Sequence, residues 1–117
     1  MLSYSEAYRT FSADALAKEV LLGSLEHGLN ACVECCDRWA TNGRVALHWM
    51  STDFQRRSIT FAELAAESAK FANVLTARGI RPGDVVAGMI PRVPELLVVM
   101  LGTWRAGAIY LLISAES

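Results

Sequence analysis

Three closely spaced cysteines are the first residues in this chain whose types could do chemistry. Cys32, Cys35 and Cys36 fall within one helical pattern, at spacings that place them on one face of a helix. A closed zinc site needs four ligands, and the two histidines, His27 and His48, stand at spacings that match no common zinc pattern. We therefore interpret the cysteines as small interior residues and keep a thiolate metal site as the weakest alternative.

A redox pair is another interpretation of Cys32 and Cys35. Redox pairs of this spacing usually stand where a strand meets a helix, whereas these two lie inside a helical pattern beside Asp37. The negative charge of Asp37 opposes thiolate formation, which disfavours a redox role.

Motifs for phosphate binding and for acyl transfer are absent. The sequence contains neither G-x-G-x-x-G nor G-x-x-x-x-G-K-[ST], and the turn Gly79–Gly83 precedes a strand pattern rather than a helix. There is no G-x-S-x-G motif, and neither Ser68 nor Ser114 has a histidine close by in sequence. We therefore expect no catalytic, cofactor-binding or metal-binding residue in this chain.

One loop offers a weaker candidate. Pro91–Glu95 follows the carboxyl end of an expected parallel strand, where ligands usually bind in open α/β sheets, and Arg92 could meet an anion there. A single arginine in such a loop is more often a solvated surface charge, so that interpretation is favoured.

The elements that would position these residues begin with helices. Residues 1–23 hold a helical pattern with Ser12 as a cap, and Asn30–Trp39 forms a second pattern that ends at the turn 41–43. Arg44–Met50 alternates as a strand does, and the polar residues 51–57 lead as a hairpin loop into a short strand at Ser58–Phe61.

From residue 60 onward the pattern alternates between helix and strand. Thr60 and Glu63 form a capping box, and the helix after them ends at Gly79. The remaining elements are the strand Val85–Ile90, apolar on both faces, a helix from Pro94 to Ala106, and the strand Ala108–Ile113.

This order predicts an α/β fold. Successive crossovers from residue 44 onward would build a partial, open and mainly parallel sheet, preceded by an α-helical segment. We expect two parts: a helical amino-terminal extension at residues 1–29 and an incomplete α/β domain at residues 30–117.

Composition excludes several classes of function. The 117 residues are 53% hydrophobic, and 11 Lys and Arg face 12 Asp and Glu, so no positive surplus favours nucleic acid or an anionic membrane. The longest apolar stretch, Leu96–Leu101, falls well short of the roughly 20 residues of a membrane span. Met1–Tyr8 lacks the pattern of a signal peptide, so a cytoplasmic location is expected.

Several segments taken together resemble the first part of the AMP-forming, or adenylate-forming, acyl-CoA synthetases. In matching order and spacing these segments are Thr60–Leu64, Phe71–Leu75, Gly79–Ala87, Ile90–Glu95 and Arg105–Tyr110. Asn30 with Cys36–Trp39, and Ala46–Trp49, are similar to the acetyl and medium-chain branch. The resemblance covers roughly residues 28 to 110, which is most of the chain.

The resemblance implies a two-step reaction in a full-length family member. A carboxylic acid reacts with ATP, assisted by magnesium, to give an acyl-adenylate and pyrophosphate, and the acyl group then passes to the thiol of coenzyme A. The family's phosphate loop, its Tyr-Gly-x-Thr-Glu segment, its ribose-binding Asp and its catalytic Lys do not occur here. ATP, Mg²⁺ and CoA are therefore implied for the full-length protein and not for this segment alone.

The end of the sequence departs from the family pattern. After the strand at Ala108–Tyr110 the family usually turns at an apolar-proline step, whereas Leu111–Ser117 contains no proline. We expect a truncated amino-terminal segment that is inactive alone, so that classification as an enzyme stays open. The alternative is a non-enzymatic module that pairs with another chain, or with itself, through the strand edge at Ala108–Ile113.

Overall fold

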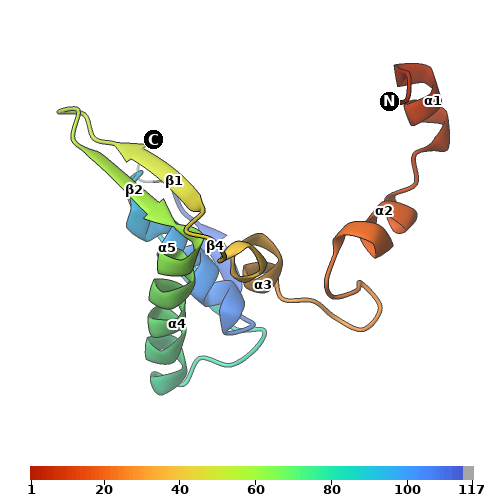
Figure 1. Cartoon of the computed structure of the whole chain (residues 1–117). Coiled ribbons are helices and arrows are strands. Elements are labelled where there is room, and N and C mark those ends of the chain that lie inside the picture. Colours follow the sequence, from red (N-terminus) through yellow and green to blue (C-terminus); the bar gives the residue numbers. More distant parts are fainter. Residues whose placement is uncertain (115–117) are drawn as a thin grey trace.

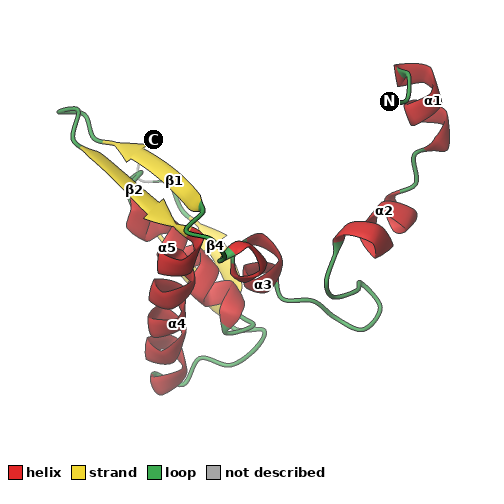
Figure 2. Ribbon diagram, in the orientation of Figure 1, coloured by secondary structure: helices red, strands yellow, loops and turns green. Residues whose placement is uncertain are grey.

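The computed structural model describes residues 1–114, and helices and strands alternate in it from residue 56 onward, much as the sequence predicts (Figures 1 and 2). In chain order the elements are α1 (Tyr4–Thr10), α2 (Ala13–Val20), α3 (Ala31–Cys35), the 3₁₀ turn η1 (Asp37–Trp39), β1 (Val45–Met50), β2 (Arg56–Thr60), α4 (Phe61–Ala77), β3 (Val85–Gly88), α5 (Pro94–Arg105) and β4 (Ile109–Leu112). The predicted α/β class is confirmed.

The first two strands form the expected hairpin. β1 and β2 pair antiparallel, with Trp49 opposite Arg57 and Met50 opposite Arg56. The turn is shorter than predicted, because Arg56 and Arg57 belong to the strand and not to the loop. The placement of these two residues in a loop was therefore wrong: both side chains are exposed, so their charges do not interrupt the ladder.

The longest helix begins and ends where the sequence predicts. The hydroxyl of Thr60 accepts from the amide of Glu63, at 3.1 Å, and the Glu63 carboxylate accepts from the amide of Thr60, at 2.8 Å. Gly79 follows the helix with a φ of 86°, a left-handed conformation that glycine adopts without strain. The capping box and the glycine stop are both confirmed.

β3 and β4 form a parallel pair joined by α5. Val85 pairs with Ile109 and Ala87 with Leu111, which is the register expected of a β-α-β crossover. The hairpin does not join this sheet, so the described residues contain two separate two-stranded sheets. The sequence predicted successive crossovers from residue 44 onward, whereas the described residues contain one crossover, which runs through α5.

Only one face of the parallel sheet is covered. Gly88 is buried, whereas the opposite face exposes about half of Val85, Ile109 and Leu111, at 57%, 54% and 50%. The apolar pattern on both faces of Val85–Ile90 predicts cover on both sides, and within the described residues only one side is covered. α5 packs on one side, and among the described elements it is the one that makes extensive contacts with the β3–β4 pair.

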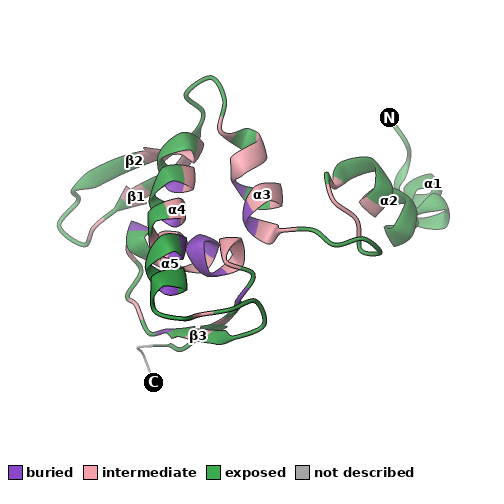
Figure 3. Cartoon of the chain, turned by 90° about the horizontal axis from the view of Figure 1, so that it is seen from below, coloured by how far each residue is buried: buried purple, intermediate pink, exposed green. Residues whose placement is uncertain are grey.

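The core lies where α3, α4 and α5 meet, as the buried residues in Figure 3 show. Cys32, Cys36, Leu64 and Leu101 form its centre. α4 and α5 approach so closely that a Cβ on Gly102 would lie 2.8 Å from the ring of Phe71. A small residue at position 102 is therefore required for this packing.

The amino-terminal segment, residues 1–29, projects away from the rest of the chain (Figure 1). α1 and α2 contain no buried residue, although both begin with a capping serine, Ser3 and Ser12. The radius of gyration, 17.1 Å, exceeds the value of about 13 Å that a compact domain of this length would have. Within this chain, α1 and α2 contribute nothing to the core.

Candidate functional site

A groove opens at the carboxyl ends of β3 and β4, where the sequence places Arg92. It has a volume of about 630 Å³ and lies between the tip of the β1–β2 hairpin and the loop that leads into α5. Its walls are mainly apolar, from Trp49, Ile90 and Leu96, and Arg92 supplies the one positive charge among its lining residues. The groove could receive an apolar group with an anionic end.

The hairpin is fastened to this loop and to the start of α5 by two contacts. The indole nitrogen of Trp49 donates to the carbonyl of Arg92, at 2.8 Å. The guanidinium of Arg57 pairs with the Glu95 carboxylate, at 3.1 Å, and lies 6.0 Å from the ring of Trp49. A hydrogen bond from the backbone amide of Glu95 itself, and then the hydrogen bond from Arg57, hold the pKa of the Glu95 carboxyl below its usual value.

Sequence reasoning placed Arg92 here but missed Trp49. Nothing in the alternation of β1 singles out this tryptophan, because its partner is a backbone carbonyl 43 residues away. The Arg92 side chain is exposed, as the favoured interpretation of a surface charge requires.

The turn at 79–83 has no amides to spare for a phosphate. The amide of Arg81 donates to the Asp84 carboxylate, at 2.7 Å, and that of Gly83 donates to the carbonyl of Gly107, at 3.0 Å. Gly83 also has a φ of 89°, so the turn is built for chain reversal. The turn leads into the strand β3, as the sequence predicts.

Two of the three cysteines are interior, and the third is not. Cys32 and Cys36 are fully buried, whereas Cys35 is exposed. The expectation that all three share one buried face was wrong for Cys35, because α3 ends there and the backbone changes direction at Cys36. Burial raises the pKa of the Cys36 thiol to about 11 and also raises that of Cys32, so neither is a ready nucleophile.

Ser68 serves a buried polar junction and not a catalytic triad. Its hydroxyl donates to the carbonyl of Ala65, at 2.9 Å, and accepts from the guanidinium of Arg105, at 3.1 Å. Arg105 also bonds to the Asp37 carboxylate, at 2.5 Å. This junction joins η1, α4 and α5, and its hydrogen-bonding groups are already used in holding the helices together.

The remaining candidates lie apart from one another. His27 is exposed in the amino-terminal segment, His48 bonds to Ser58 on the hairpin at 2.9 Å, and Ser114 lines the groove at the end of β4. Across residues 1–114, no three His, Cys, Asp or Glu side chains gather closely enough to hold a metal ion. The same part of the chain has no helix with both the length and the apolar character needed to cross a membrane.

Comparison with known proteins gives a consistent result. The family model of AMP-binding enzymes matches residues 36–117. The acetyl-coenzyme A synthetase of Shewanella pealeana is 44% identical over 85 residues, which are 70% of this chain and 13% of that protein.

Solved structures agree with this match. The acyl-CoA synthetase of Brucella canis is 45% identical, with a TM-score of 0.88 over 94% of this chain and 20% of its own. The ATP-bound MatB of Rhodopseudomonas palustris is 33% identical, with a TM-score of 0.61 over 75% of this chain and 17% of its own.

This chain therefore spans a small share, between 13% and 20%, of the length of these three relatives. The family match extends over well more than half of the chain, and the matched region of the solved relatives is their amino-terminal part. The chain belongs to the AMP-binding enzyme family, and its resemblance to the AMP-forming acyl-CoA synthetases is confirmed.

Proposed function

We propose that these residues form the amino-terminal scaffold of an AMP-forming acyl-CoA synthetase, and that on their own they do not catalyse its reaction. The observation that carries this proposal is the half-exposed apolar face of β3 and β4, in a chain that superimposes on one fifth of the Brucella canis enzyme. Exposure of such an apolar face to water raises the free energy of the folded chain, and further chain packed against the face removes this penalty.

In the full-length protein, the activity that follows is activation of a carboxylic acid by ATP and transfer of the acyl group to coenzyme A. The name of the Shewanella pealeana relative favours acetate. The sequence resemblance to the acetyl and medium-chain branch extends the proposed range to medium-chain fatty acids. The groove at the carboxyl ends of β3 and β4 supplies only one positive charge and a wall of apolar side chains. Its role in this proposal is to form part of a wall around groups that other segments supply.

The described residues do not fit ATP and magnesium by themselves. The amides of the 79–83 turn are occupied, and residues 1–114 contain no cluster of acidic side chains suited to a metal. We therefore assign no catalytic, cofactor-binding or metal-binding residue to this segment. A cytoplasmic location and a boundary near residue 29 remain part of the proposal.

Pyrophosphate release tests the inactivity of the segment. The purified chain is incubated with ATP, Mg²⁺, coenzyme A and either acetate or octanoate, and the Brucella canis acyl-CoA synthetase serves as the positive control. We expect no pyrophosphate above the level without enzyme. Release that depends on the added acid and survives a second purification step would overturn the claim of inactivity.

A second candidate function rests on the strand β4. Among the described strands β4 pairs only with β3, so its outer edge offers backbone groups to a further strand. In this alternative the chain is a non-enzymatic module that joins another chain, or a copy of itself, through that edge. Light scattering after size exclusion separates the two: a stoichiometric complex of defined mass favours the module, and a monomer or a polydisperse aggregate favours the scaffold.

A further inference from the structure

Two side chains attach the amino-terminal segment, residues 1–29, to the later part of the described chain. Neither α1 nor α2 contains a buried residue, so packing contributes little to holding the segment in place. Three hydrogen bonds join its backbone to later side chains, and each of them ends on Glu34 or Arg38. Glu34 belongs to α3 and Arg38 to η1, so both stand on the helix junction.

The carboxylate of Glu34 makes two of these three bonds. It accepts from the amides of Leu22, at 3.0 Å, and Gly23, at 2.8 Å. The Glu34 side chain is only 8% exposed. The amide of Gly23, and then that of Leu22, hold the pKa of the Glu34 carboxyl below its usual value. The carboxylate therefore stays ionised at neutral pH, and an ionised acceptor strengthens both hydrogen bonds.

Arg38 makes the third bond. Its guanidinium donates to the carbonyl of Val20, at 2.6 Å, and pairs with the Glu34 carboxylate, at 3.1 Å. The same guanidinium lies 4.9 Å from the centre of the Trp39 ring, and the Trp39 indole donates to the carbonyl of Glu34, at 3.0 Å. The two charged side chains thus position each other and hold the backbone from Val20 to Gly23 at three points.

Gly23 makes this attachment sterically specific. A Cβ at this position would lie 2.7 Å from the carbonyl oxygen of Gly28 and 2.7 Å from the Cβ of Leu29, so a larger residue would force the backbone to move. The loop that follows closes on itself: the amide of Ser24 donates to the carbonyl of Gly28, at 3.1 Å, and the amide of Gly28 donates to the carbonyl of Ser24, at 2.8 Å. The chain therefore leaves the attachment by a defined path.

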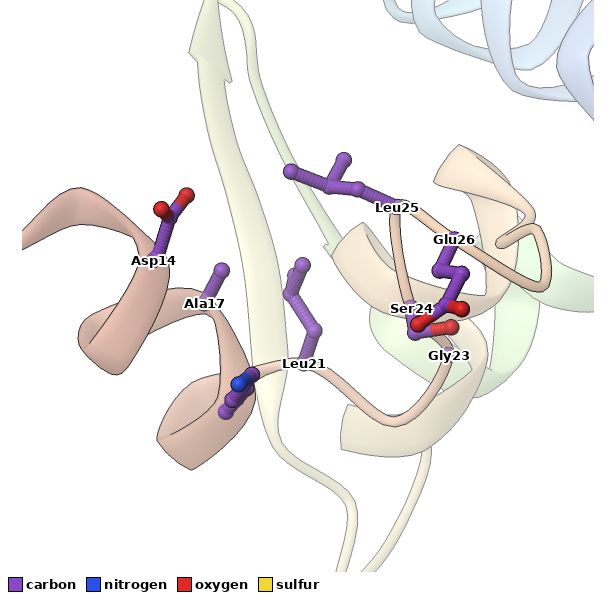
Figure 4. Close-up of a pocket in the computed structure, with 8 residues that line it drawn as sticks. Asp14, Ala17, Leu21, Gly23, Ser24, Leu25 and Glu26 are labelled. Carbon is purple, nitrogen blue, oxygen red and sulfur yellow. The ribbon is translucent and has the colours of Figure 1, made fainter.

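Apolar packing between α2 and this loop is loose. A hollow of about 270 Å³ separates them, with Ala17 and Leu21 on one side and Leu25 on the other (Figure 4). Side chains that face an unfilled gap gain little dispersion energy from each other. The hydrogen bonds to Glu34 and Arg38 therefore determine the direction of the segment more than apolar contacts do.

The segment takes a similar course in a longer relative. Residues 30–117 amount to about three quarters of the chain, so a match over 94% of it must include most of the amino-terminal segment. The Brucella canis enzyme gives that match at a TM-score of 0.88, and four fifths of its own length lie outside the matched region. The course of α1 and α2 is thus the same with and without that further chain.

We propose that Glu34 and Arg38 form a latch that sets the direction of the amino-terminal segment within this chain, without help from further chain. Opening the latch releases α1 and α2 and leaves the junction of α3, α4 and α5 folded, because residues 1–29 contribute no buried residue to that junction. The latch is a property of these residues themselves and does not depend on the proposed scaffold function.

Spin labels measure the direction of the segment in the purified chain. One label is placed at Ser5→Cys on α1 and the other at Asn73→Cys, an exposed position of α4, in a chain that also carries Cys35→Ser. Burial keeps Cys32 and Cys36 from the labelling reagent. Double electron–electron resonance then gives the distribution of distances between the labels. We expect a narrow distribution in this parent chain.

Two matched substitutions test whether Glu34 is the centre of the latch. Glu34→Gln removes the charge and replaces one accepting oxygen by a donor, so we expect the distance distribution to broaden by at least about twofold. Glu67→Gln is the control: it breaks an exposed ion pair with Lys70, at 2.8 Å, on α4 and should leave the width unchanged. Neither substitution should change the thermal midpoint of the chain.

A second matched pair tests the arginine. Arg38→Met should broaden the distribution by less than Glu34→Gln does, because the Glu34 carboxylate keeps its two backbone amides. Arg44→Met removes the other guanidinium that lies over the Trp39 ring, at 5.3 Å, and should leave the width unchanged.

Several results would overturn the latch. A broad distribution in the parent chain would mean that the segment has no fixed direction of its own. An unchanged width in Glu34→Gln, or equal broadening in Glu67→Gln, would mean that other contacts hold the segment. A fall of the thermal midpoint by more than about 5 °C in Glu34→Gln would mean that Glu34 supports the helix junction itself, so that the segment is not released separately.

Discussion

Two regions of this chain both have apolar sequence patterns, and they differ in whether described segments cover them. The junction of α3, α4 and α5 buries Leu64 and Leu101 from both sides, whereas the pair β3–β4 is covered by α5 on one face only. An apolar pattern therefore predicts burial in the finished fold, but it does not identify the segment of chain that provides the cover. In the junction the cover lies within the described residues, and for the sheet we propose that it lies beyond them.

The largest difference between the two regions is expected when a leucine is replaced by alanine in each of them and the free energies of unfolding are compared. Leu101→Ala removes a 5% exposed side chain from the core and should lower the free energy of unfolding of the isolated chain by about 3 kcal/mol. Leu111→Ala, at a half-exposed position of β4, should lower it by less than about 1 kcal/mol. Urea unfolding followed by tryptophan fluorescence measures both values.

The same two variants can be compared in a longer protein. In a chimera that joins this chain to the four fifths of the Brucella canis acyl-CoA synthetase outside the match, Leu111→Ala should lower the free energy of unfolding as much as Leu101→Ala does, because further chain then covers the sheet face. Equal costs already in the isolated chain would show that the sheet face is closed without further chain, and the contrast would disappear.

A smaller effect is expected at the polar part of the junction. Arg105→Met keeps the length of the side chain but leaves the Asp37 carboxylate and the carbonyl of Ala65 without their guanidinium partner. Because Arg105 is largely buried, we expect a loss of about 2 kcal/mol, measured by the same urea unfolding. Arg92→Met is the matched control in the exposed loop and should change the free energy of unfolding by less than about 0.5 kcal/mol.

The buried thiol of Cys36 makes the free energy of unfolding depend on pH. Burial first, and then the nearby Cys32 and Asp37, raises the pKa of the Cys36 thiol to about 11 from an ordinary value of 9.0. The folded chain therefore keeps this proton where the unfolded chain loses it, so stability is full below pH 9 and falls as the pH rises from 9 to 11. We expect a loss of about 1 kcal/mol at pH 10, relative to pH 8.

A cysteine-free position 36 is the control for this titration. Cys36→Ala should start from a lower stability and lose less between pH 8 and pH 10 than the parent chain. An identical slope in both proteins would assign the alkaline loss to other groups.

Local rules explain which elements the sequence could predict. The capping box of Thr60 and Glu63, the stop at Gly79 and the proline at the start of α5 each depend on residues within a few positions of one another. Each lies in the structure where its local pattern places it. The hairpin was predictable for the same reason, apart from the two arginines that extend β2.

Features that depend on distant segments could not be predicted in this way. The donation from Trp49 to the carbonyl of Arg92 joins positions 43 residues apart, and the Arg105–Asp37 pair joins positions 68 apart. Cys35 shows the same limit on a smaller scale: its exposure follows from the break at Cys36, which no capping residue signals. The candidate groove was predictable only as a location, the carboxyl end of β3, and not by its walls.

The smallest expected effect compares two caps that look alike in sequence. Thr60 caps α4, which packs in the core, and Ser12 caps α2, which packs on nothing in the described chain. Thr60→Ala should lower the free energy of unfolding of the isolated chain by about 0.5 to 1 kcal/mol, since loss of the cap is felt by the whole cooperative unit. Ser12→Ala should leave that free energy unchanged and only increase amide exchange in α2. A loss of similar size for Ser12→Ala would mean that α2 unfolds together with the core, and the amino-terminal segment would then belong to the same cooperative unit as the helix junction.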